Sequence, residues 1–239
     1  MTPINSLIRT SDDEPVSYGE PSLREQVLAE LRWEIVAGRV GADTIYSVPS
    51  LAQRMGVSTT PVREALLELA RAGLLVPMRN RGFKVVEPTL NDLNDLFDVR
   101  ETLEVEAAVR LAKSGVKDAS ALRSLADEIG DAVARGEVDA YLERDREFHR
   151  AFVGLLGNKL MTELVMNLRD NMRLYGIASD LGRERQRASV REHYQLLALV
   201  DAGDTDAIGA LMRHHISTWR KVFSASLTEG RSSGHGDRR

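Results

Sequence analysis

An aspartate and three histidines in the second half of the chain could together bind a metal ion. Asp145 and His149 are four residues apart in a stretch with helical spacing of apolar residues, which would place both on one helix face. His193 lies near the start of a later helical pattern. His215 lies on the apolar stripe of the last pattern, whereas His214, about 100° away, is expected to face solvent. One carboxylate and three imidazoles suit Zn²⁺, Ni²⁺, Fe²⁺ or Mn²⁺, although this spacing also occurs by chance among ordinary core and surface histidines.

A second group of side chains in the first half of the chain has the chemistry of a DNA-binding surface. Residues 54–84 contain six Lys or Arg against two Asp or Glu, while the whole chain has a net charge of −4. A nucleic-acid footprint depends on local charge, so the overall charge does not argue against DNA binding. The alternative is that these charges are solvated on a small helical domain.

The elements that would position this surface follow the order of a winged helix–turn–helix. Apolar spacing predicts helices from about Leu23 to Gly38, over 50–55 and over 58–72, with 39–47 as a loop and a turn at 56–58. Two strand-like runs, 74–77 and 82–86, flank a basic turn. The second helix of such a motif presents its N-terminal residues to the major groove. We expect Ser58 to cap that helix with its hydroxyl. The expected DNA contacts are Ser58, Thr59, Thr60 and Arg63 on the helix, with Arg79 and Arg81 on the hairpin.

The rest of the chain is helical in pattern, so the predicted fold is mainly α: an N-terminal winged helix–turn–helix with a small β-hairpin, then an all-α bundle. The predicted domains are a flexible arm at 1–17, a DNA-binding domain at 18–88, a helical domain at 89–228 and a disordered tail at 229–239. The bundle helices are expected near 90–113, 118–135, 138–156, 158–178, 184–202 and 204–227.

Composition excludes several classes of protein. The chain has no cysteine, which rules out disulfides and cysteine-ligated metals. It has no apolar run of about 18 residues that could cross a membrane. Its polar start lacks the features of a signal peptide, so we expect a cytoplasmic protein.

The helix–turn–helix and hairpin residues closely resemble the DNA-binding domain of GntR-family bacterial transcription regulators, over about 20–88. The residues that carry this resemblance are Leu51, Ala52, Gly56, Val57, Ser58, Pro61, Val62, Arg63, Glu64, Ala65, Leu66, Leu69, Gly73, Leu74, Arg79, Asn80, Arg81, Gly82, Phe83 and Val85. The resemblance implies operator contacts by Ser58, Thr60, Arg63, Arg81 and Gly82. The family usually carries Arg where this chain has Thr59, and Arg54 or Arg79 could compensate.

The second half, over about 92–222, looks like the FCD ligand-binding domain of the FadR-type branch of that family. The segments that carry this resemblance are 99–104, 145–149, 157–158, 192–193 and 212–216. The resemblance implies that Asp145, His149, His193 and His215 are metal ligands and that a small carboxylate completes the coordination. Arg100 is the main candidate to bind that carboxylate. Further candidates are Arg169, Asn171 and Arg173, for which a polar helix face is the alternative.

These observations favour a homodimeric transcription regulator that binds double-stranded operator DNA and responds to a small carboxylate. Zinc is the preferred metal, and we expect the protein to act as a repressor. Two alternatives stay open: a metal-dependent hydrolase or oxygenase, and a sensor in which the metal itself is the signal.

Overall fold

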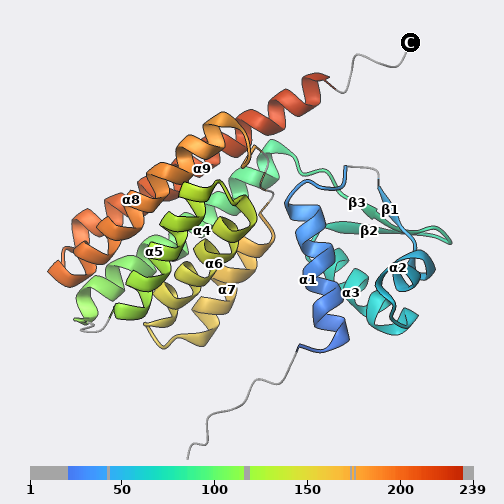
Figure 1. Cartoon of the computed structure of the whole chain (residues 1–239), viewed down its shortest axis with the longest axis horizontal. Coiled ribbons are helices and arrows are strands. Elements are labelled where there is room, and N and C mark those ends of the chain that lie inside the picture. Colours follow the sequence, from blue (N-terminus) through green and yellow to red (C-terminus); the bar gives the residue numbers. More distant parts are fainter. Residues whose placement is uncertain (1–20, 42–43, 116–118, 173, 175, 234–239) are drawn as a thin grey trace, which may run out of the picture.

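The computed structural model describes residues 21–41, 44–115, 119–172, 174 and 176–233. Figure 1 shows a small N-terminal region, coloured blue to teal, beside a larger bundle of helices. The predicted fold class is confirmed, because helices dominate and the strands form one small antiparallel sheet within the N-terminal region. The predicted arm at 1–17 lies outside the described residues.

The N-terminal region is a winged helix–turn–helix. Its elements are α1 (Leu23–Val36), β1 (Ile45–Tyr46), α2 (Val48–Met55), α3 (Thr59–Arg71), β2 (Leu75–Met78) and β3 (Gly82–Val85). A capping box between Ser22 and Glu25 begins α1, and the left-handed Gly56 ends α2. The capping box fixes where α1 starts. The left-handed glycine ends α2 and lets α3 start in a different direction.

The wing contains a strand that the sequence analysis assigned to a loop. Ile45 and Tyr46 pair antiparallel with Lys84 and Phe83, so the sheet has the order β1-β3-β2. Two residues are too short to show the alternation that marks a strand. The close approach of β1 also explains Gly82, because a Cβ at this position would lie 2.1 Å from the Tyr46 carbonyl oxygen.

The bundle consists of six helices among the described residues. These are α4 (Leu90–Ser114), α5 (Ser120–Arg135), α6 (Val138–Gly154), α7 (Lys159–Asp170), α8 (Asp180–Ala202) and α9 (Thr205–Ser233). A capping box between Thr89 and Asp92 begins α4, directly after Pro88. Helix α9 continues into the segment expected to be a disordered tail, and residues 234–239 lie outside the described part.

Helix α7 is shorter, and α8 starts earlier, than the sequence predicts. The chain leaves α7 at Asp170, and the Leu174 amide donates to the Val36 carbonyl of α1 at 3.0 Å. Gly182, expected to be a break, instead lies in the first turn of α8. A Cβ there would lie 2.2 Å from the Gly176 carbonyl oxygen, so the glycine permits a close backbone approach.

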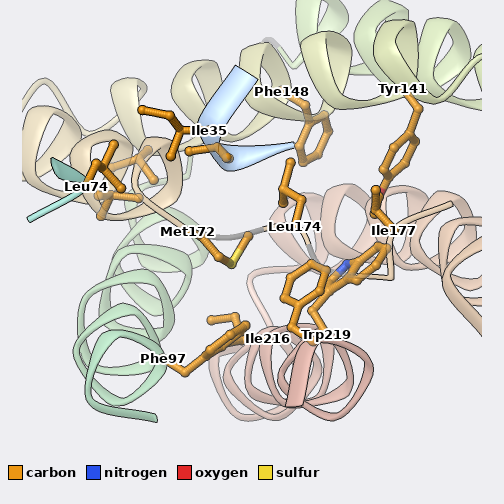
Figure 2. Packing of buried hydrophobic residues seen from close by; sticks show 14 of the residues in the cluster. Ile35, Leu74, Phe97, Tyr141, Phe148, Met172, Leu174, Ile177, Ile216 and Trp219 are labelled. Carbon is orange, nitrogen blue, oxygen red and sulfur yellow. The ribbon is translucent and has the colours of Figure 1, made fainter. Parts of the chain in front are cut away.

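The buried apolar residues of the two regions form one continuous cluster. Figure 2 shows Met172 and Leu174 in the middle of this junction, with Ile35 of α1 on one side and Phe97 and Ile216 of the bundle on the other. The segment after α7 therefore packs between the regions. Within the described residues, none of the helices is long and apolar enough to span a membrane.

Candidate metal centre and DNA-binding surface

Three helices bring the predicted metal ligands together inside the bundle. Asp145 and His149 come from α6, His193 from α8 and His215 from α9. One ligand atom from each residue lies within 4.8 Å of the other three, and all four side chains are buried. His214, the neighbour of His215, has 62% of its side chain exposed.

The distances between these atoms suit a metal ion. The His149 and His193 Nε2 atoms are 3.3 Å apart, and the Asp145 Oδ1 atom lies 3.8 Å from the first and 3.4 Å from the second. Donor atoms placed tetrahedrally around zinc at ordinary bond lengths are about 3.3–3.6 Å apart. Asp145 Oδ1 is buried and has no hydrogen-bond partner. An unpaired buried carboxylate oxygen is costly, and a cation would satisfy it.

The protonation states also suit a metal. Burial lowers the pKa of His149 well below its usual value and lowers that of His193 from 6.5 to about 3. Burial likewise lowers the pKa of His215. Burial raises the pKa of Asp145, but the positive charge of Arg169 opposes this, and the net shift is downward. The site therefore holds neutral imidazoles and an ionised carboxylate at neutral pH, which are the forms that bind metals.

A chain of buried ion pairs holds Asp145 in place. Arg169 donates to Asp145 Oδ2 at 2.6 Å and to Glu104 Oε2 at 2.9 Å, and Arg100 donates to Glu104 Oε1 at 2.7 Å. Glu104 Oε2 also lies 3.7 Å from His149 Nδ1. The pairing orients Asp145 so that one oxygen binds Arg169 while the other faces the histidines.

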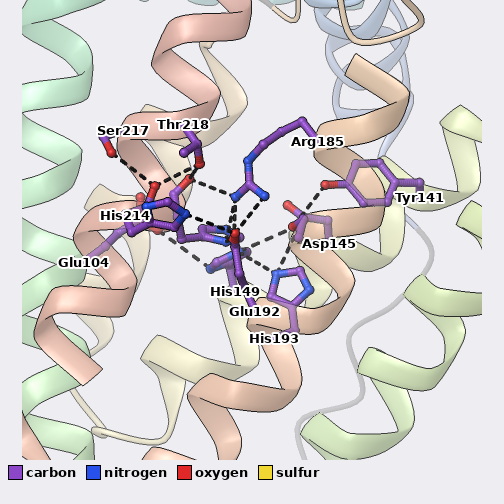
Figure 3. A network of polar contacts seen from close by, with 12 residues as sticks. Glu104, Tyr141, Asp145, His149, Arg185, Glu192, His193, His214, Ser217 and Thr218 are labelled. Atoms are coloured by element: carbon purple, nitrogen blue, oxygen red, sulfur yellow. Dashed lines mark hydrogen bonds and ion pairs between the residues drawn. The ribbon is translucent and has the colours of Figure 1, made fainter. Parts of the chain in front are cut away.

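A second buried pair, formed by Arg185 and Glu192 (Figure 3), orients His215. Glu192 Oε2 lies 2.7 Å from His215 Nδ1, and Glu192 is in turn bound by both terminal nitrogens of Arg185. Burial raises the pKa of Glu192, but the hydrogen bond with His215 and the Arg185 charge outweigh it and lower that pKa to about 2. A carboxylate bound at Nδ1 leaves Nε2 of His215 for a metal.

The predicted carboxylate-binding residues do not form one group: two lie in the buried ion pairs, and one lies at the junction of the two regions. Arg100 is buried and contacts Glu104 and the Met172 sulfur, while Arg169 lies in the pairing described above. The Arg169 side chain is only 8% exposed, so it does not lie on a solvent-facing side of its helix. Asn171 accepts a hydrogen bond from Arg32 of α1 at 2.5 Å, at the junction of the two regions. Arg173 lies outside the described residues.

Glu104, Arg185 and Glu192 were not predicted from the sequence as residues of the site. On an amphipathic helix, charged residues predict a solvent-facing side, and only tertiary packing turns these inward. The sequence held one signal for the two glutamates. Glu192 is next to His193, and Glu104 follows Arg100 by four residues, which are positions from which buried pairs can form.

The predicted DNA contacts form an exposed surface on α3 and the wing. Ser58, Thr59, Thr60 and Arg63 are exposed at the start of α3, as are Arg79 and Arg81 between β2 and β3. Contrary to expectation, the Ser58 side chain makes no capping hydrogen bond. The hydroxyl and the first amides of α3 are thus available for phosphate oxygens.

Arg54, considered as a replacement for the arginine usual at position 59, has a partner within the protein. Its guanidinium lies 2.9 Å from Glu34 Oε1, and Tyr46 donates to the other oxygen of that carboxylate at 3.0 Å. Arg54 remains 47% exposed. Gly82 is set by packing against β1, so its contribution to DNA contact would come from its backbone.

Comparison with known families assigns both regions. Residues 23–85 match the model described as bacterial regulatory proteins, gntR family, and residues 95–218 match the FCD domain. The chain belongs to the GntR family of transcription regulators, in the group with an FCD domain. It is a DNA-binding transcription regulator, and its relatives are regulators rather than enzymes.

Individual relatives agree with this assignment. The chain is 32% identical to the Nta operon transcriptional regulator of Aminobacter aminovorans, over 70% of this chain and 78% of that protein. It is 26% identical to the gluconate operon transcriptional repressor of Bacillus licheniformis, over 71% of this chain and 68% of that protein. The solved structure of Escherichia coli McbR/YncC shares the fold, with a TM-score of 0.73 and 24% identity over 88% of this chain and 99% of that one.

Proposed function

We propose that this regulator represses transcription from an operator and is released by a small carboxylate that binds at a metal in the FCD domain. One observation carries the proposal: four buried ligand atoms converge within 4.8 Å, and one of them, Asp145 Oδ1, has no hydrogen-bond partner. Three imidazoles and a carboxylate without cysteine favour Zn²⁺, with Ni²⁺, Fe²⁺ or Mn²⁺ as other candidates.

The charge around the cluster supports an anionic effector. Three buried arginines, Arg100, Arg169 and Arg185, balance three carboxylates, Glu104, Asp145 and Glu192. The histidines are neutral, so a divalent ion adds two uncompensated positive charges in a region of low dielectric. A small carboxylate bound to the metal would reduce that charge and fill an open coordination position.

DNA recognition is proposed to use α3 and the wing of each subunit in a homodimer. Arg63 would contact a base edge, whereas Ser58, Thr59, Thr60, Arg79 and Arg81 would contact phosphates or the minor groove. Two such helices on successive half-sites, about 34 Å apart, fit a near-palindromic operator. The effector can change the affinity only by binding the DNA-competent and DNA-incompetent arrangements differently.

The test starts from an operator selected with the full-length protein from a random duplex library. Operator affinity is then measured after chelation, after addition of Zn²⁺ alone, and after Zn²⁺ with each member of a panel of hydroxy acids, sugar acids and dicarboxylates. Weakening of at least tenfold that needs both metal and one carboxylate supports the proposal. Full switching by metal alone would instead identify a metal sensor, and a carboxylate effect that survives chelation would remove the metal from the mechanism.

A further inference from the structure

A cavity of about 540 Å³ lies between α1 of the DNA-binding region and α6 and α7 of the bundle. Its volume is within the range of small-molecule sites, about 300–1,000 Å³. One wall of the cavity is formed by α1 of the DNA-binding region, whereas the metal centre is formed by bundle helices alone. Figure 1 shows α1 facing the bundle beside α7, and residues of both helices line the cavity.

The wall of this junction cavity is largely apolar. Leu28 and Trp33 of α1 face Leu142 of α6 and Met166 of α7 across it. Trp33 and Leu142 are each only partly buried and pack against the edge of the core. A ligand with an apolar portion would remove these side chains from water, which is favourable in proportion to the area covered.

Arg32 provides a cationic group in that wall. It is half-buried, and its guanidinium donates to the neutral amide oxygen of Asn171 at 2.5 Å. No ion pair of Arg32 is found in the part of the chain that the structure describes. Three other wall arginines differ from it. Arg146 binds Asp170 through two bonds of 2.5 and 2.6 Å, Arg169 binds Asp145 and Glu104, and Arg150 is exposed to solvent rather than half-buried. Arg32 is therefore the half-buried guanidinium left to attract an anion.

The inner wall separates the cavity from the metal centre. Asp145 and Arg169 line the cavity, yet Asp145 Oδ2 is bound by Arg169 while Oδ1 faces His193. The two sites therefore share Asp145 and Arg169 as a wall, whereas Arg32, Leu28, Trp33, Leu142 and Met166 line the cavity and are not among the four candidate metal ligands.

We propose that the junction cavity is a second ligand site, which binds an organic monoanion with an apolar chain. The anionic head pairs with Arg32, and the chain lies against Leu28, Trp33, Leu142 and Met166. Because α1 is tied to α3 by the Arg24 to Glu68 ion pair at 2.6 Å, the occupant contacts the DNA-binding region and the bundle together. Its binding favours one relative arrangement of the two.

Octanoate serves as the probe, titrated calorimetrically into chelator-treated full-length protein, with octan-1-ol and acetate as partial mimics. We expect octanoate to bind and both mimics to bind at least tenfold more weakly. Octan-1-ol lacks the anionic head, and acetate lacks the apolar chain. Ala29 is an exposed residue of α1 that lines the cavity, so Ala29→Phe should fill the space and weaken octanoate at least tenfold. Ala121→Phe, at an exposed position of α5 away from the cavity, is the matched control and should bind like the natural protein.

Arg32→Gln keeps a donor for Asn171 but removes the charge, and it should bring octanoate to the affinity of octan-1-ol. Thermal unfolding checks that each variant is folded. Unchanged affinity in both Ala29→Phe and Arg32→Gln overturns the proposal, as does the absence of octanoate binding to the natural protein. Octanoate binding that appears only after Zn²⁺ is restored also overturns it, because the ligand then belongs to the metal centre. None of these outcomes depends on whether the metal centre regulates DNA binding.

Discussion

The DNA-binding surface and the metal cluster differ most in their contact with water. Arg63, Arg79 and Arg81 are exposed, whereas His149 and His193 are 0% exposed and His215 is 1% exposed. The exposed side chains are free to meet DNA but do little for folding. The buried ones depend on the fold for their geometry and influence its stability in turn. Substitutions on the DNA-binding surface should therefore change DNA affinity without changing stability. Substitutions in the cluster should change metal binding and stability together.

The largest effect is expected from Arg63→Ala. This change removes the proposed base contact from both subunits of a dimer, at about 1–3 kcal/mol for each contact, so operator binding should weaken by about thirtyfold or more in a gel-shift titration. The thermal midpoint should stay unchanged because Arg63 is exposed. Arg71→Ala, in the last turn of the same helix, is the control and should bind more nearly like the natural protein. Equal losses in both variants would count against the placement of α3 in the groove.

The double substitution His149→Ala with His193→Ala should abolish metal binding and lower stability together. A metal at a hundredfold excess over its Kd stabilises the folded state by about 2.7 kcal/mol. The metal-dependent increase in the thermal midpoint, about 5–10 °C for a chain of this size, should therefore disappear. Elemental analysis of the purified protein measures the metal directly. His214→Ala, at an exposed neighbouring position, should keep its metal, and an unchanged metal content in the double variant would refute the ligand assignment.

The metal-free protein should lose stability as the pH falls below about 6.5. Burial lowers the pKa of His193 from 6.5 to about 3, so between these values the unfolded chain binds a proton that the folded chain does not. Each such histidine then contributes a slope of about 1.4 kcal/mol per pH unit, with higher stability at higher pH. Denaturant titrations of chelated protein at several pH values should show this slope, and His193→Asn should make it shallower. An identical slope in the variant would show that His193 titrates normally in the folded protein.

The smallest effect is expected from Thr59→Arg. This substitution restores the charge that the family usually carries, at an exposed position at the start of α3. One added phosphate contact per subunit should raise operator affinity several-fold and steepen the dependence of log K on log salt by about 0.9 for each contact. Thr59→Gln, which adds length without charge, should leave the salt slope unchanged. A slope that stays the same in Thr59→Arg would mean that this position does not face a phosphate.

Local signals predicted much of the DNA-binding region. The helix–turn–helix around Gly56 and the basic turn between 74–77 and 82–86 agree with α2, α3, β2 and β3, because capping residues and short apolar periodicity act within a few residues. The two residues of β1 were missed because their pairing with Phe83 and Lys84 is a long-range contact without a local pattern. The end of α7 was misplaced as well: the helix ends at Asp170, and the Leu174 amide then donates to the Val36 carbonyl of α1, a long-range contact without a local pattern.

The sequence by itself determined the types of the candidate ligands, the order of the helices and the face shared by Asp145 and His149, since helical geometry relates residues four apart. Only the tertiary structure decided that Arg169, Arg185 and Glu192 point inward and orient those ligands. It also placed Arg32 of the DNA-binding region beside a cavity of the bundle. The physical reason is that burial of a charged group depends on the partners that surround it, and those partners come from helices that are distant in the sequence.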